Sequence, residues 1–217
     1  MERTPEPEMM DLPEEAAAYA AADFSRVNTA FVARILDLAP GESAVLADLG
    51  CGPGDICCRI RAARPGWRVV GVDAAHAMLA IASENAKARA AGVVYVESDA
   101  KALPLRAGAF TIICSNSILH HLSAPLDFWR EVRRIAAPGA VVLMRDLFRP
   151  PTATAARAIV EEHARDESAL LQEEYYRSLL AAFTPDEVRG QLEAAGLGSL
   201  AVEVVTDRHM DIHGRVG

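Results

Sequence analysis

The stretch AVLADLGCGPGD, residues 44–55, decides the fold that we predict for this chain. Residues 44–50 form a short apolar run that is typical of a buried strand, and residues 55–64 follow with a helical pattern. Between them, Gly50, Gly52 and Gly54 allow tight turns and a close approach of a ligand to the backbone. Strand, turn and helix therefore stand in the order that a ligand-binding turn requires.

Four further apolar runs alternate with helical patterns after this turn. We expect strands at residues 68–73, 93–97, 109–115 and 140–145, and helices at 74–90 and 124–137, with Ser123 as a cap. Apolar strands without strict alternation, separated by helices, are typical of a parallel sheet covered on both faces. Right-handed crossovers make this a doubly wound α/β sheet, in which ligands bind beyond the carboxyl ends of the strands.

The two ends of the chain add elements to this core. Residues 13–38 are predicted to be helical with a break near Asp23, after which Ser25 can cap a second helix, and residues 152–182 predict one or two more helices. Thr184-Pro185-Asp186-Glu187 is a capping box. Two strands follow, at residues 199–205 and 208–214, and their short connection requires an antiparallel pair. We therefore expect seven strands, mostly parallel, with a C-terminal antiparallel hairpin.

Composition and charge exclude several classes of protein. The 217 residues are 51% hydrophobic, which suits one well-filled domain, and no uncharged apolar run is long enough to span a membrane. The N-terminus is acidic and rich in proline, unlike a secretory signal, so we expect a cytoplasmic protein. The four cysteines fit no zinc spacing and are interpreted as reduced thiols, and no metal site is predicted.

The net charge of −8 is concentrated in two segments. Residues 1–40 hold eight acidic and three basic residues, and residues 150–183 hold six acidic and three basic residues, so the remainder is neutral. Such a chain is a poor partner for phosphate backbones. The acidic segments are either solvated helix faces or the border of a substrate entrance, and the sequence leaves both interpretations open.

A dinucleotide-binding site is disfavoured by the same glycine turn. The dinucleotide fingerprint is GxGxxG, whereas the third glycine here comes one residue early and Asp55 follows it. An acid would then lie where a pyrophosphate needs the helix N-terminus, and Pro53 removes one N–H donor. A ligand without phosphate fits the turn better.

Three stretches together resemble the motifs of class I S-adenosylmethionine-dependent methyltransferases. They are ADLGCGPGD (47–55), GVDAAHAMLAIA (71–82) and ESDAKALPLRAGAFTIICSNSILHHL (97–122). The resemblance implies a Rossmann-like seven-stranded fold, S-adenosyl-L-methionine as cofactor and methyl transfer as the activity. The donor-binding residues that it implies are Tyr19, Asp48, Gly50, Cys51, Gly52, Gly54, Asp73, Ala74, Met78, Asp99, Ala100, Ser115 and Asn116.

The resemblance also implies roles for individual residues. Asp73 would accept two hydrogen bonds from the ribose diol, and Asp99 would accept one from the adenine amino group. Met78 would pack near the adenine. The alternatives are that Asp73 only caps the following helix and that Asp99 is a plain turn residue.

The sequence says less about which residues bind or activate the methyl acceptor. His121, and next to it His120, are candidate general bases directly after the fourth strand, although an LHHL loop can also be a packing element. Arg145 is a third candidate, because it can bind an acceptor carboxylate or form a salt bridge with Asp146 or a neighbour. Tyr175 and Tyr176 can line an acceptor pocket or pack the insert.

We predict one methyltransferase domain over residues 1–217. It comprises a helical lid (1–40), a donor-binding core (41–146), a helical insert (147–183), and a helix with the hairpin (184–217). After the fourth strand the chain has no prolines or aromatic residue of the nucleic-acid amino-methyltransferase kind, and it has no basic patch. A small-molecule acceptor is therefore favoured, with no nucleic-acid or membrane partner, and a homodimer is left open. A donor-binding regulator without turnover and a protein or RNA methyltransferase are the alternatives.

Overall fold

The computed structural model describes residues 1–6 and 13–217 and contains one seven-stranded sheet, in the order β3-β2-β1-β4-β5-β7-β6. The strands are β1 (Val45–Leu49), β2 (Arg68–Asp73), β3 (Val93–Glu97), β4 (Phe110–Asn116), β5 (Ala136–Leu147), β6 (Ala201–Val204) and β7 (His209–Arg215). The first five strands pair in parallel, and β7 lies antiparallel between β5 and β6. This order confirms the predicted doubly wound sheet with its C-terminal hairpin.

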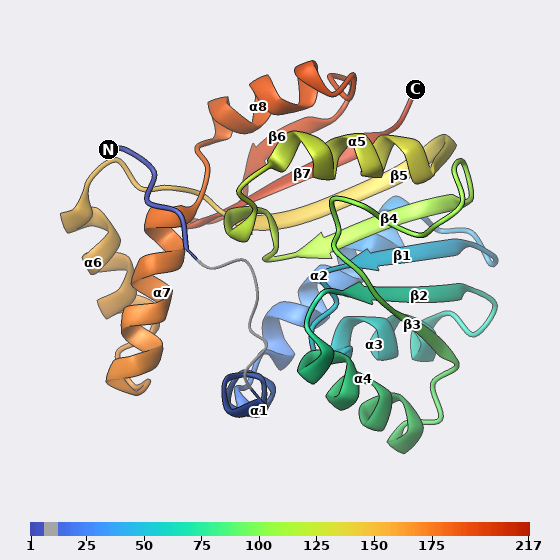
Figure 1. Cartoon of the computed structure of the whole chain (residues 1–217), viewed down its shortest axis with the longest axis horizontal. Coiled ribbons are helices and arrows are strands. Elements are labelled where there is room, and N and C mark those ends of the chain that lie inside the picture. Colours follow the sequence, from blue (N-terminus) through green and yellow to red (C-terminus); the bar gives the residue numbers. More distant parts are fainter. Residues whose placement is uncertain (7–12) are drawn as a thin grey trace.

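Helices cover both faces of the sheet. They are α1 (Pro13–Ala21), α2 (Ser25–Leu38), α3 (Asp55–Ala63), α4 (His76–Ala88), the short 3-10 helix η1 (Leu119–His121), α5 (Pro125–Ile135), α6 (Ala153–His163), α7 (Ala169–Ala181) and α8 (Pro185–Ala194). In Figure 1, α5 and α8 lie on one face, and α2, α3 and α4 lie on the other. The arrowheads of β1 and β4 point toward the side where α6 and α7 lie.

The core consists of two large apolar clusters, one on each face of the sheet. Ala47 and Leu49 of β1 belong to the cluster with α5 and its Trp129, whereas Leu46 belongs to the cluster with α2 and α3. Successive side chains of a strand point to opposite faces, so a strand covered on both faces must be apolar at consecutive positions. This explains why the strands of the central sheet lack an alternating pattern in the sequence.

Three local predictions were wrong in their details. The residue that precedes α2 is Phe24, and the helix begins at Ser25, whose backbone N–H donates to the carboxylate of Asp23 at 2.9 Å. Likewise, the residue that directly precedes α5 is Ala124, one residue after the expected cap Ser123. Ala136 and Ala137, expected to be helical, are instead the first residues of β5, and Pro138 disfavours helical backbone at Ala137, directly before it. The capping box at the start of α8 is present as predicted.

The N-terminal residues lie along the helical insert. Thr4 donates its backbone N–H to Leu180 of α7 at 3.0 Å, and the terminal amine of Met1 lies 3.2 Å from the carbonyl oxygen of Pro151. Figure 1 shows this segment running beside α7 at the end of the sheet where β4 ends. Among the helices of residues 1–6 and 13–217, none is long and apolar enough to cross a membrane.

Candidate active site

The glycine turn joins β1 to α3 and is held tightly against β2. Gly50, Gly52 and Gly54 have φ angles of +70°, +51° and +77°, a region that other residues rarely adopt. The backbone N–H groups of Gly50 and Cys51 both donate to the carbonyl oxygen of Val72, at 2.8 and 2.9 Å. A Cβ on Gly50 would lie 2.7 Å from the side chain of Ile118. Both the conformation and the space therefore require glycine here.

Asp73 connects the turn to the start of α4. One carboxylate oxygen accepts from the backbone N–H of Gly52 at 2.8 Å, and the other accepts from that of Ala75 at 2.9 Å. Burial raises the pKa of Asp73 above its ordinary value. A carboxylate offers about four acceptor sites, so two backbone bonds leave room for a vicinal diol. The predicted helix-capping and ligand-binding roles of this side chain are thus compatible.

Asp48 lies beneath the turn and is 1% exposed. Its oxygens accept from the thiols of Cys57 at 3.2 Å and Cys114 at 3.6 Å, and burial raises its pKa to about 6. Two of the four cysteines thus donate hydrogen bonds to a buried carboxylate near the end of β1. The sequence showed the cysteines only as reduced thiols, because their partner becomes visible once β1, α3 and β4 pack together.

Helix α1 brings Tyr19 and Ala16 onto the turn and α4. Ala16 is fully buried against Met78, in a small apolar cluster that also includes Ala75. The ring of Tyr19 reaches within 4.0 Å of the position that a Cβ on Gly52 would occupy, and burial raises the pKa of its hydroxyl. The structure therefore brings Tyr19, Met78 and the turn together, as the sequence-based set of donor-binding residues requires.

The remaining predicted donor-binding residues follow β3 and end β4. Asp99 is exposed, and its carboxylate accepts from the backbone N–H of Lys101 at 2.8 Å, as a turn residue does, while Ala100 is buried. Ser115 is buried and donates its hydroxyl to the carbonyl oxygen of Leu49 at 2.6 Å, which ties β4 to β1. Asn116 ends β4. These residues lie at the carboxyl ends of their strands, as predicted.

The carboxylate of Asp146 holds η1 in place. It accepts from the backbone N–H of Leu119 at 2.6 Å and lies 2.5 Å from Nδ1 of His120. Both Asp146 and His120 are almost completely buried. Burial disfavours the charged imidazole, but the negative charge and hydrogen bond of Asp146 outweigh it, and the pKa of His120 is raised.

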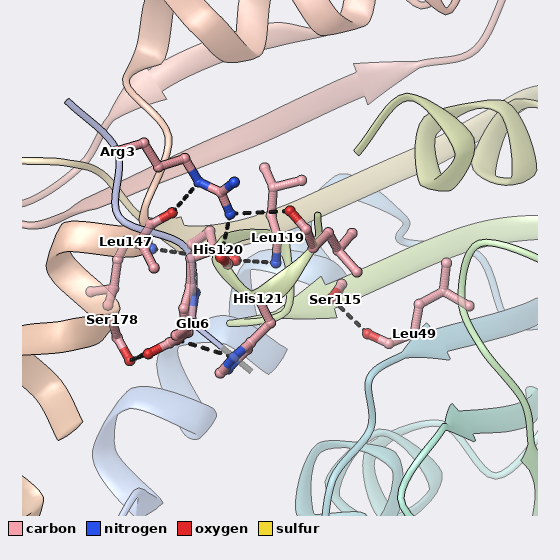
Figure 2. Close-up of polar contacts among 12 residues, drawn as sticks. Arg3, Glu6, Leu49, Ser115, Leu119, His120, His121, Leu147 and Ser178 are labelled. Atoms are coloured by element: carbon pink, nitrogen blue, oxygen red, sulfur yellow. Dashed lines mark hydrogen bonds and ion pairs between the residues drawn. The ribbon is translucent and has the colours of Figure 1, made fainter. Parts of the chain in front are cut away.

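Glu6 of the N-terminal segment reaches both histidines. Its Oε1 lies 3.1 Å from Nδ1 of His121 and 3.6 Å from Nε2 of His120, and Ser178 of α7 donates its hydroxyl to Oε1 at 3.1 Å. Figure 2 shows Glu6 between Ser178 and His121. Burial raises the pKa of Glu6, but its contacts with His121 and His120 outweigh burial, so the pKa is lowered. Sequence reasoning missed Glu6, which lies in no motif.

Arg3 anchors the segment that carries Glu6. Its guanidinium donates to the carbonyl oxygens of His120 at 2.8 Å and Leu122 at 3.0 Å, and also to that of Ala181. The same group lies 4.0 Å from the centre of the Phe183 ring. One side chain therefore links the N-terminal segment to η1 and to the end of α7, as Figure 2 shows for η1.

Arg145 pairs with Asp211, and not with Asp146, the partner that the sequence analysis named. Its guanidinium makes two hydrogen bonds of 2.7 Å to the carboxylate of Asp211, which is 1% exposed. The predicted role in binding an acceptor carboxylate stays a prediction, and it would compete with this pair. Tyr175 and Tyr176 pack against the α6–α7 cluster, where Arg157 lies 3.4 Å from the centre of the Tyr176 ring.

Comparison with known proteins agrees with this arrangement. Residues 47–144 match a family model described as a methyltransferase domain. The malonyl-[acyl-carrier protein] O-methyltransferase of Geobacter sulfurreducens is 31% identical over 199 residues, which cover 88% of this chain and 69% of the relative. The chain belongs to the class I S-adenosylmethionine-dependent methyltransferases. The residues that match the family model include the glycine turn and Asp73.

Two other members show how far the similarity extends. The demethylmenaquinone methyltransferase of Thermus thermophilus is 34% identical over 119 residues, which cover 54% of each chain. A SAM-dependent methyltransferase from Aquifex aeolicus has the same fold, with a TM-score of 0.71 and 19% identity over 95% of this chain and 99% of its own. The chain spans 36%, 54% and 61% of the length of three curated relatives that it matches.

Proposed function

We propose that the chain binds S-adenosyl-L-methionine at the glycine turn and transfers its methyl group to a small-molecule acceptor. The observation that carries the proposal is the carboxylate of Asp73, at the end of β2 and bonded to the turn through Gly52. The turn ends β1, and β1 lies beside β4, so the strand order reverses at this point. Ligands of doubly wound sheets bind at such a switch point.

The side chains around the turn suit this donor better than a dinucleotide. Asp55 is the first residue of α3, and its carboxylate lies 2.5 Å from Arg59 and 2.7 Å from Arg89. A pyrophosphate at this helix N-terminus would face a carboxylate and compete with it for both guanidinium groups. A sulfonium donor has no phosphate to place there, and its ribose diol matches the free acceptor sites of Asp73.

The bound donor supplies a methyl group on a positively charged sulfur. The chain has to hold donor and acceptor in line and keep water away, and much of the rate can come from this alignment. Tyr19 lies over the turn, and Glu6 joins η1 to α7. We propose that residues 1–6, 13–40 and 147–183 border the acceptor entrance, which is one of the two interpretations that the sequence left open for the acidic segments. His121 and His120 stay candidate bases for an acceptor that must lose a proton.

The relatives support an acceptor of modest size. One is named for a demethylated quinone, and another for a malonyl group carried on an acyl-carrier protein. The name of the second relative favours an alternative in which the acceptor is a small acyl group attached to a carrier protein. A donor-binding regulator without turnover is the other alternative, and it predicts binding without a methylated product.

Two measurements test the proposal. Calorimetry with S-adenosylmethionine, its demethylated product and NAD should show binding of the first two alone, and preference for NAD would overturn the assignment of the turn. A labelled-methyl screen over small amines, thiols, phenols and carboxylic acids, free and carrier-linked, should then identify a methylated product. Tight donor binding with no product from any class would instead support the regulator.

A further inference from the structure

Three potential metal ligands converge where the N-terminal segment meets η1. Glu6, His120 and His121 each offer one ligand atom, and these three atoms lie within 4.8 Å of one another. His120 is 3% exposed, and the side chains of His121 and Glu6 are 19% and 12% exposed. The three groups therefore share a site that is largely shielded from water, and Figure 2 shows Glu6 and His121 facing each other.

The spacing of these atoms fits one ion between them. Nitrogen and oxygen ligands lie about 2.0–2.1 Å from zinc, so neighbours in a tetrahedral site are about 3.3 Å apart. Oε1 of Glu6 lies 3.1 Å from Nδ1 of His121 and 3.6 Å from Nε2 of His120. Nδ1 of His121 is buried, and although close to Glu6 it lacks a partner in hydrogen-bond geometry among the described residues. An ion would satisfy this nitrogen.

The surroundings orient the ligands as metal sites usually do. Metal-binding histidines commonly direct their second ring nitrogen to a carboxylate, which fixes the ring and its tautomer. His120 does so through Nδ1 and Asp146, which leaves Nε2 directed at Glu6. Ser178 in turn donates to the carboxylate of Glu6. Arg3 also reaches this region, but its guanidinium donates to the carbonyl oxygens of His120 and Leu122 and not to the ligand atoms.

A second cluster of the same residue types provides a contrast. Glu162, His163 and Asp207 also lie within ligand distance of one another, but all three are exposed. Nε2 of His163 lies 2.7 Å from Asp207 and 2.7 Å from the guanidinium of Arg208. A cation already occupies this cluster, so it is a weaker metal site and a suitable control.

We propose that Glu6, His120 and His121 bind a divalent transition-metal ion of the zinc type. Imidazole and carboxylate ligands suit such ions, and three protein ligands leave a coordination position open. The open position is available to an oxygen or sulfur atom of the acceptor, whose pKa the ion would lower. This last role rests on the proposed methyl transfer, whereas binding of the ion does not. With the ion bound, His120 and His121 would act as ligands and not as the general bases considered above.

The test uses the full-length chain without a tag, freed of metal with a chelator and then dialysed. Cobalt(II) is the probe, because its visible absorption reports nitrogen and oxygen ligation, and zinc displaces it in competition. The variants are Glu6→Gln, which keeps the shape and removes the charge, and His121→Ala. His120→Ala is avoided because it would leave the buried carboxylate of Asp146 unpaired. His163→Ala is the matched control.

We expect one cobalt ion per chain, at least tenfold weaker binding in Glu6→Gln and His121→Ala, and affinity within twofold of the wild type in His163→Ala. Thermal unfolding verifies that each variant is folded. Absence of stoichiometric binding, unchanged affinity in both folded site variants, or loss of binding in His163→Ala would each overturn the inference. Donor binding measured with the chelator present is independent, so it separates a failure here from a failure of the proposed function.

Discussion

Replacing Asp73 with alanine removes a side chain that joins the glycine turn, the start of α4 and the proposed ribose site. Its two oxygens accept from Gly52 and Ala75, so the substitution leaves two backbone N–H groups without this partner. At about 1 kcal/mol for each bond, the free energy of unfolding should fall by about 2 kcal/mol. For a chain of this size that lowers Tm by about 4–8 °C, and the protein should stay folded.

The effect on the donor should exceed the effect on the fold. Two ribose hydroxyls that donate to a carboxylate contribute about 1.5–3 kcal/mol each, and 1.4 kcal/mol corresponds to a tenfold change in affinity. We therefore expect the Kd for S-adenosylmethionine to rise at least tenfold in Asp73→Ala. Asp73→Asn keeps one acceptor oxygen, so its affinity should lie between those of Asp73→Ala and the wild type.

Calorimetry with the donor and its demethylated product measures the affinity, and thermal unfolding without ligand measures the stability. Glu97→Ala is a matched control, because Glu97 ends the neighbouring strand β3 and its carboxylate pairs with His76 at the surface. The control should bind the donor as the wild type does. If a folded Asp73→Ala protein binds within twofold of the wild type, Asp73 is only a structural anchor and our placement of the ribose is wrong.

Two further predictions concern the buried acid and the N-terminal segment. Burial raises the pKa of Asp48 in the folded chain from 3.8 to about 6. The folded chain is therefore most stable, as far as this group is concerned, below pH about 4, where Asp48 is protonated. This stability is lost as the pH rises through 6 and the buried carboxyl group becomes charged. Asp48→Asn should therefore be more stable than the wild type at pH 7.5, by at most about 3 kcal/mol, with the gain fading toward pH 4 in thermal unfolding; a gain independent of pH would contradict this. Deleting residues 1–24, of which 7–12 lie outside the described residues, removes Glu6 and Tyr19 and should leave a folded chain with weaker donor binding and little or no transfer. Calorimetry and turnover measurements test this. Unchanged turnover would refute the proposed lid role of the N-terminal residues, and loss of folding would show that residues 1–24 are needed for the core.

Much of the local structure around the proposed donor site could be predicted from the sequence because its signals are local. A strand, three glycines and a helix start occur within residues 44–64, and the left-handed conformation of the turn is what selects glycine there. Asp73 directly follows a β-type run, so its place at the edge of a parallel sheet follows from the strand itself. The capping box at Thr184 is equally local, since its two hydrogen bonds join residues three apart.

The acceptor side depends on residues that are far apart in the sequence. Glu6 reaches His121 only because the N-terminal segment lies along α7, and Arg145 finds Asp211 only because β7 pairs with β5. Neither pair has a characteristic separation in the sequence from which it could be recognised. Which side chains meet depends on how the helices and strands pack together. The sequence by itself therefore determined the sheet and its glycine turn, whereas the tertiary structure alone decided which charged groups meet at η1, because those contacts form only when the N-terminal segment packs against η1 and α7.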